Sequence, residues 1–239
     1  MNNIHFIKEP LDTICKDGMQ AASALKCTFD TFPVFDYLLQ SIFLRMTGCL
    51  EQKAKLIIWD MASYDADYRY HILSTKIGEC SSLKDKKKIF NDLWEQIQKL
   101  SPNEKFNPPI EKYLNDIKSS IQNIFTDSPF VLAYPQDFKN WEETILKWMK
   151  KVPKIQGEMS KGICFLDKNK EWEKGIKSMI DFRNTLAHNT KSHIKNIPPL
   201  STMNSDMYIY ENYFIRFSLL MLIDQIFRDF FNKYLNLRY

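Results

Sequence analysis

Two long segments of the chain, residues 34–61 and 206–237, carry bulky apolar side chains at helical spacing. Apolar side chains that recur every three or four residues indicate helices that pack against a core. In the first segment the apolar positions are Phe35, Leu38, Leu39, Ile42, Phe43, Met46, Leu50, Ile57 and Ile58. These residues lie on more than one side of the helix, so we expect it to be central. The second segment is rich in aromatic residues, which we expect in the core or in a dimer interface.

The rest of the chain fits the same architecture. Further helices are predicted over 64–77, 82–100, 110–125, 138–149 and 170–188, and irregular segments over 1–33, 153–169 and 189–205. Only 6 Gly are present, which together with the helical spacing argues against a strand-rich fold. We therefore predict a single all-α domain over residues 1–239, a helical bundle with long N-terminal and C-terminal helices.

Composition narrows the class of protein. Hydrophobic residues make up 44% of the chain and aromatic residues 14%, enough for a packed core. The net charge of +4 allows nucleic-acid binding but does not by itself indicate it. The most apolar run, 214–223, contains Arg216 and is too short to span a bilayer. The five cysteines are scattered without zinc-ligand spacing, and no secretory signal precedes them. We expect a soluble cytoplasmic protein with reduced thiols.

The densest group of reactive side chains is the stretch RNTLAH, from Arg183 to His188. Arginine is a permanent cation whose planar fork matches phosphate oxygens in pairs. Histidine gives and takes protons near neutral pH, and Asn184 supplies both a donor and an acceptor. This combination suits chemistry on a phosphodiester.

The spacing of the motif sets a geometric problem. On the predicted helix, Asn184 and His188 share a face, whereas Arg183 lies about 140° around the axis from His188. Three arrangements could bring the Arg and His together. The Arg can wrap around the helix, the helix can end or loosen near the His, or a second copy of the chain can complete the site. The polar run from Asn189 and the later prolines predict that the helix ends soon after His188.

The pattern Arg183-Asn184-x-x-Ala187-His188, in a small all-helical chain with a long apolar helix after it, resembles the HEPN superfamily. The signature of that family is an Arg, four to six residues and a His, often with a polar residue directly after the Arg. The resemblance implies a helical bundle that dimerises so that two motifs face each other. It also implies RNA cleavage without a metal or other cofactor, commonly in toxin–antitoxin, abortive-infection or CRISPR-associated defence.

The resemblance and the chemistry of the side chains together assign roles to the motif. The RNA 2′-hydroxyl is expected to attack the adjacent phosphate, which leaves a 2′,3′-cyclic phosphate and a free 5′-hydroxyl. His188 would act as general base or general acid, and Arg183 would neutralise charge on the phosphoryl oxygens. Asn184 would orient the imidazole or hold a phosphate oxygen.

Four further residues are candidates for substrate binding. His193 and Lys191 lie in the polar loop after the motif. Arg69 and Tyr70 place a cation beside an aromatic ring, a combination that can stack on unpaired bases. The basic run Lys84–Lys88 is interpreted as the solvated start of a helix.

No metal site is predicted. The acidic neighbours Asp60, Asp65 and Asp67 match the spacing of no standard ion-binding loop.

Two other functions stay open. One is a non-catalytic HEPN-like module that binds RNA or a nucleotide and partners another protein, such as a nucleotidyltransferase antitoxin. The other is a structural helical adaptor, in which Arg183 lies on a solvated helix face and His188 caps the helix C-terminus.

Overall fold

The computed structural model describes residues 3–28, 30–75, 80–151, 170–188 and 208–239. These residues form helices and, within the described ranges, no β-strand, which confirms the predicted all-α class. The elements are α1 (Asn3–Lys8), α2 (Asp12–Ala22), α3 (Phe32–Tyr64), α4 (Ala66–Ser74), α5 (Leu83–Leu100), α6 (Ile110–Phe125), α7 (Pro129–Ala133), α8 (Pro135–Lys151), α9 (Lys170–His188), the 3₁₀ helix η4 (Tyr208–Glu211) and α11 (Tyr213–Arg238).

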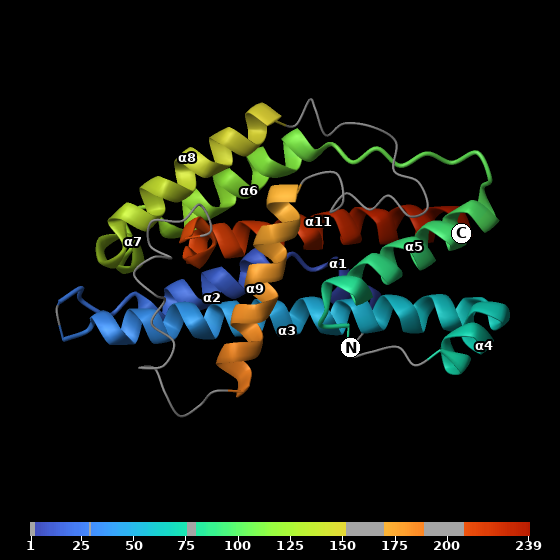
Figure 1. The fold of residues 1–239 in the computed structure, drawn as a ribbon, viewed down its shortest axis with the longest axis horizontal. Coiled ribbons are helices and arrows are strands. Elements are labelled where there is room, and N and C mark those ends of the chain that lie inside the picture. Colours follow the sequence, from blue (N-terminus) through green and yellow to red (C-terminus); the bar gives the residue numbers. More distant parts are fainter. Residues whose placement is uncertain (1–2, 29, 76–79, 152–169, 189–207) are drawn as a thin grey trace.

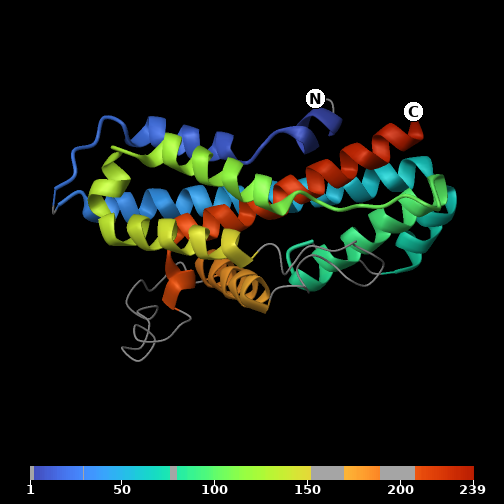
Figure 2. The same cartoon turned by 90° about the horizontal axis from the view of Figure 1, so that it is seen from above.

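The long helices α3 and α11 lie side by side along the length of the molecule (Figure 1). α11 contacts α3, α5, α6, α8 and α9, and it is buried along most of its length. Viewed from above, α1 and α2 cover one side of the α3–α11 pair and α9 lies on the opposite side (Figure 2). The centre of the bundle is therefore α11 as much as α3.

The aromatic residues of α11 belong to the core. The Trp141 indole Nε1 donates to Ser218 Oγ at 2.8 Å, and both residues are fully buried. Phe90 of α5 stacks on Phe230, with ring centroids 4.8 Å apart. Because α5 and α8 cover these rings, packing within one chain accounts for them without a dimer interface.

The prediction of an irregular segment over 1–33 was wrong. α1 and α2 both lie there, and Pro10 only separates them. Ile7 of α1, Cys15 of α2 and the intervening Leu11 are buried against the bundle. Gly18 permits the close approach, since a Cβ at this position would lie 2.3 Å from Ile42 Cδ1 of α3. Tertiary packing thus stabilises helices too short to form alone.

The prediction of one continuous helix over 206–237 also needs correction. The chain forms η4 first and begins α11 only at Tyr213; residues 206 and 207 lie outside the described part. Asn212 interrupts the helix because its side chain accepts from the backbone N–H groups of Phe214 and Ile215, at 2.9 and 3.3 Å. It also donates to the backbone carbonyl of Asp137 at 2.6 Å. An N-cap with this geometry starts a new helix.

Other boundaries follow the sequence closely. α6 has the predicted bounds, and α5 begins at a capping box between Ser82 and Asp85. The predicted helix over 64–77 forms as α4 over a shorter range, because extended Asp65 ends α3 and N-caps α4. The short helix α7 lies between α6 and α8, where no helix is predicted.

Candidate functional site

The helix that carries the motif, α9, packs steeply across α3 and α11 (Figure 1). Its inner face buries Trp172, Ile176 and Met179, which recur at helical spacing. Gly175 lies under the ring of Tyr210, where a Cβ would come within 2.6 Å of that ring. The amphipathic pattern therefore fixes which side of α9 faces the core and leaves Asn184 exposed.

Phe182 anchors the C-terminal half of α9. The guanidinium carbon of Arg216, on α11, lies 3.6 Å from the centroid of the Phe182 ring. Arg216 is 1% exposed and donates to Glu211 at 2.8 Å. Burial lowers the pKa of Arg216, and the Glu211 carboxylate opposes that shift. This cation–π contact in a dry environment holds the backbone next to Arg183.

Arg183 is paired with the central helix α3. Its Nη2 lies 2.7 Å from Oε2 of Glu51, and its Nη1 donates to Asn184 Oδ1 at 3.0 Å. The side chains of Arg183 and Glu51 are 23% and 13% exposed. The guanidinium is thus held by a carboxylate on one side and an amide on the other, at the edge of the bundle.

The backbone of α9 is helical through His188, so the helix does not loosen between the two motif residues. The Arg183 guanidinium contacts both Glu51 of α3 and Asn184, which lies one helical turn before His188 on α9. The structure describes the backbone of His188 only. Of the arrangements predicted for the site, only a helix that loosens between Arg183 and His188 is excluded, because α9 ends at His188 itself. A helix end near the His, a wrapping Arg and a second copy all remain.

A second cation lies close to the Arg183–Glu51 pair. Lys86 of α5 is 5% exposed, and its Nζ donates to the carbonyls of Cys80 and Ser81 at 3.1 and 3.0 Å. Burial lowers the pKa of Lys86, the Glu51 carboxylate raises it, and Arg183 lowers it again. A small pocket lies between α3, α5 and α9 and is lined by Thr47, Leu50, Glu51, Ser81, Lys86, Met179, Ile180, Arg183 and Leu220.

Comparison of the chain with family models, curated proteins and solved structures finds no match. The resemblance to the HEPN superfamily therefore stays a prediction from the motif and the helical class. Within the described ranges, no group of three His, Cys, Asp or Glu side chains is placed to hold a metal ion. In the same part of the chain, none of the helices has the length and apolarity that a membrane crossing requires.

The structure does not bring Arg69 or Tyr70 next to Arg183. Arg69 and Tyr70 lie on α4, at the end of the bundle away from α9 in both views (Figures 1 and 2). Tyr70 is 78% exposed, and Arg69 Nε donates to the Ala62 carbonyl at 2.9 Å. Lys191 and His193 lie outside the described residues.

The charge runs singled out in the sequence have structural partners. Within the basic run of α5, Lys87 pairs with Glu173 at 3.1 Å and Lys88 with Asp92 at 2.8 Å. Among the three acidic residues considered for a metal, Asp65 caps α4 and pairs with Lys99. Asp60 pairs with Arg238 at 2.7 Å. These contacts explain the two clusters as parts of the fold.

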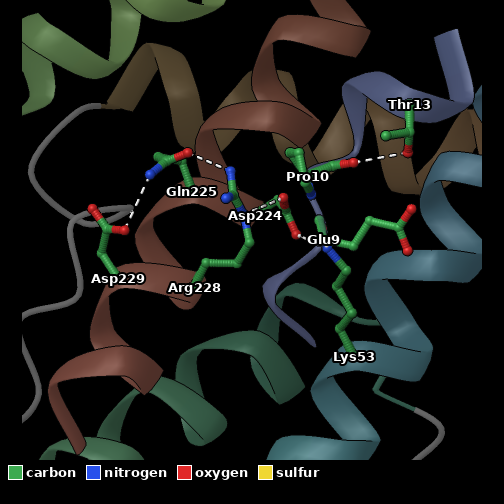
Figure 3. Close-up of polar contacts among 8 residues, drawn as sticks. All are labelled: Glu9, Pro10, Thr13, Lys53, Asp224, Gln225, Arg228 and Asp229. Carbon is green, nitrogen blue, oxygen red and sulfur yellow. Dashed lines mark hydrogen bonds and ion pairs between the residues drawn. The ribbon is translucent and has the colours of Figure 1, made fainter. Parts of the chain in front are cut away.

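A separate polar cluster lies between α3 and α11 (Figure 3). Lys53 and Asp224 form an ion pair at 2.7 Å with side chains 4% and 1% exposed. Arg228 Nε donates to the second oxygen of Asp224 at 2.8 Å, and Lys53 Nζ also donates to the Glu9 carbonyl. Burial raises the pKa of Asp224, whereas Lys53 and Arg228 lower it.

The sequence did not reveal Glu51, and the prediction of a solvated basic run was wrong for Lys86, which is 5% exposed. The available signal was position, because Lys86 precedes Ile89, Phe90 and Leu93 on the apolar face of α5. Glu51 likewise lies beside the apolar stripe of α3. A charged residue on an apolar face must find a partner when buried. The identity of that partner depends on the tertiary fold.

Proposed function

We propose that this chain is a metal-independent endoribonuclease of the HEPN type that acts as a homodimer. The observation that carries the proposal is the anchoring of Arg183 between Glu51 and Asn184, on the same helix as His188. An anchored, half-buried guanidinium can meet a phosphate without reorganising, which is the condition under which fixed charges contribute most to rate. Its cellular role would be that of a cytoplasmic toxin or anti-phage defence effector, with an antitoxin or defence protein as partner.

The reaction needs no group beyond the RNA and these side chains. The 2′-oxygen attacks the adjacent phosphorus as its proton passes to a base, and the bond from phosphorus to the 5′-oxygen breaks. The departing 5′-oxygen takes a proton from an acid. His188 supplies one of these two roles, and the second copy of the site supplies the other. Arg183 stabilises the charge that grows on the phosphoryl oxygens.

The number of titratable groups in the motif supports a dimeric site. One copy of the motif holds a single histidine, whereas the reaction needs both a base and an acid. In a symmetric dimer, the same patch of both copies meets at the interface, so motif helices can face each other. The Arg of one copy then complements the His of the other.

The test is purification of wild type, His188→Ala and Arg183→Ala, followed by incubation with RNA. Wild type should yield fragments ending in cyclic phosphate, and either substitution should abolish them. His5→Ala is the matched control, because His5 is exposed on α1, away from α9. RNA with a 2′-deoxy nucleotide at the scissile position should resist cleavage, and EDTA should leave the rate unchanged. Intact RNA with a folded wild-type dimer would refute the proposal.

The same ion pair favours a second candidate function. If the contact between Arg183 and Glu51 only ties α9 to α3, the chain is a helical adaptor and the motif is accidental. Induction in a bacterial host separates the two functions. A nuclease stops growth and fragments total RNA unless His188 is replaced, whereas an adaptor leaves growth and RNA unchanged in both strains, including during phage challenge.

A further inference from the structure

Within the described part of the chain, the Arg183 guanidinium makes two side-chain hydrogen bonds. A guanidinium has five N–H groups, and a phosphate binds it through two that lie parallel. Glu51 accepts from Nη2 through one carboxylate oxygen, Oε2, and Asn184 accepts from Nη1. These two bonds fix the plane of the guanidinium and occupy one donor on each terminal nitrogen. The contact with Glu51 therefore orients the Arg183 guanidinium and does not prevent it from binding a phosphate.

A second cation and a second carboxylate lie near Glu51. The carboxylates of Glu51 and Asp85 raise the pKa of Lys86 against the effect of burial, whereas Arg183 lowers it. The group therefore holds two cations and two carboxylates. Since Glu51 is 13% exposed and Lys86 5%, solvent screens these charges weakly. Loss of the Glu51 carboxylate would therefore make the surroundings of Arg183 more positive.

We propose that Glu51 is the positioning residue for Arg183 in the nuclease site, an inference that rests on the proposed function. Glu51 does not touch the RNA; it holds the guanidinium where the phosphoryl oxygens gain charge. α3 is anchored along the centre of the bundle, so its side chain offers a fixed reference for the edge of α9. Misplacement of a catalytic group by about 1 Å can cost about 100-fold in rate.

The experiment compares wild type with Glu51→Gln and Glu51→Ala on one RNA oligonucleotide. Glu51→Ala removes both charge and acceptor, so kcat should fall about 10- to 100-fold. Glu51→Gln keeps an acceptor oxygen for Nη2 and should retain more activity than Glu51→Ala. The control is Glu173→Gln. Glu173 lies on α9, as Arg183 does, and the substitution removes its ion pair with Lys87 of α5. This variant should cleave like wild type.

Binding separates positioning from a loss of folded protein. A 2′-deoxy oligonucleotide binds without being cut, and removal of Glu51 makes the site more positive. The affinity of this oligonucleotide for the Glu51→Ala variant should therefore equal or exceed its affinity for wild type, whereas kcat should fall. The affinity for the variant should also depend more steeply on salt concentration. Partial unfolding would instead reduce binding sites and turnover together.

Two results overturn the inference in distinguishable ways. If wild type cleaves RNA and Glu51→Ala cleaves with unchanged kcat, Glu51 does not position Arg183 and the nuclease assignment survives. If folded wild type leaves RNA intact, the nuclease assignment fails and the positioning role fails with it.

Discussion

Two of the cation–carboxylate pairs between α3 and other helices differ in what surrounds them. Lys53 and Asp224 meet at 2.7 Å in the interior, with side chains 4% and 1% exposed. Arg183 and Glu51 meet at the same distance at the edge of the bundle, with side chains 23% and 13% exposed. Equal distances therefore do not imply equal roles. Burial and the remaining hydrogen bonds decide what each pair does.

The interior pair belongs to a network of several members. Asp224 also accepts from Arg228, and Lys53 also donates to the Glu9 carbonyl beyond the end of α1 (Figure 3). This network joins α1, α3 and α11, so the pair serves the fold. Within the described residues, the edge arginine uses two of its five guanidinium N–H groups, which suits it to meet a ligand. We infer that the interior pair is structural and that the edge pair serves function.

Breaking the interior pair should have the largest effect on stability. Asp224→Ala leaves the Lys53 ammonium buried without its carboxylate, which costs about 3–5 kcal/mol. Urea unfolding monitored by circular dichroism measures the loss. A loss below about 1 kcal/mol would show that the cluster is hydrated in solution and not buried as described.

A double substitution sharpens that result. Lys53→Met combined with Asp224→Leu replaces both charges with apolar side chains, so neither is left unpaired. Replacement of a whole buried pair is often neutral or stabilising. The double variant should therefore unfold at a higher urea concentration than Asp224→Ala. If the double variant is as unstable as Asp224→Ala, the loss of stability comes from packing and not from the unpaired charge.

Loss of the Asp65 side chain should reduce the free energy of unfolding by an amount between those expected for the interior pair and the edge pair. It accepts from the backbone N–H groups of Asp67 and Tyr68 at 2.9 and 3.0 Å and from Gln96 at 2.9 Å. Asp65→Ala removes the N-cap of α4, which should cost about 1–2 kcal/mol in urea unfolding. An unchanged unfolding midpoint would show that α4 does not contribute to the cooperative unit.

The same carboxylate predicts a dependence of stability on pH. Burial would raise the pKa of Asp65, but hydrogen bonds from Lys99, Tyr68 and Gln96 outweigh it and hold the pKa well below its ordinary value of 3.8. A carboxylate whose pKa is lowered by folding stabilises the fold fully at pH values above its ordinary pKa. This contribution declines as the pH falls below the ordinary pKa. Asp65→Asn should therefore lose less stability than wild type on acidification below about pH 4, measured as thermal midpoints across pH. Parallel curves for the two proteins would contradict it.

Elements with strong local signals could be predicted from the sequence. α6 combines an apolar stripe with flanking prolines, and α5 starts at a capping box, so both boundaries follow from neighbouring residues. α2 could not be recognised because Gly18 looks like a helix breaker until Ile42 of α3 packs against it. The N-cap of α11, Asn212, also donates to the backbone carbonyl of Asp137, and this partner is distant in sequence.

The residues of the candidate site likewise include some that the sequence reveals and some that only the fold reveals. Arg183, Asn184 and His188 stand out because reactive side chains occur close together in the sequence. Glu51 lies 132 positions before Arg183, and nothing local pairs them. Lys53 and Asp224 are 171 positions apart. Partners of this kind are set by how α3 packs against α9 and α11, and a pattern of neighbouring residues holds no information on that packing.

Arg183→Lys should have the smallest effect on stability and a large effect on cleavage. Lysine keeps the charge beside Glu51, so unfolding should shift by about 0–1 kcal/mol, as for other pairs near the surface. It loses the planar fork that contacts Glu51, Asn184 and a phosphate together, so the rate of RNA cleavage should fall steeply. Lys53→Arg offers the contrast, because enlarging a buried cation should disturb stability first. If Arg183→Lys is fully active, or if it unfolds the chain as Asp224→Ala does, then the edge pair is not the functional one. The difference between the two pairs would then be one of location only.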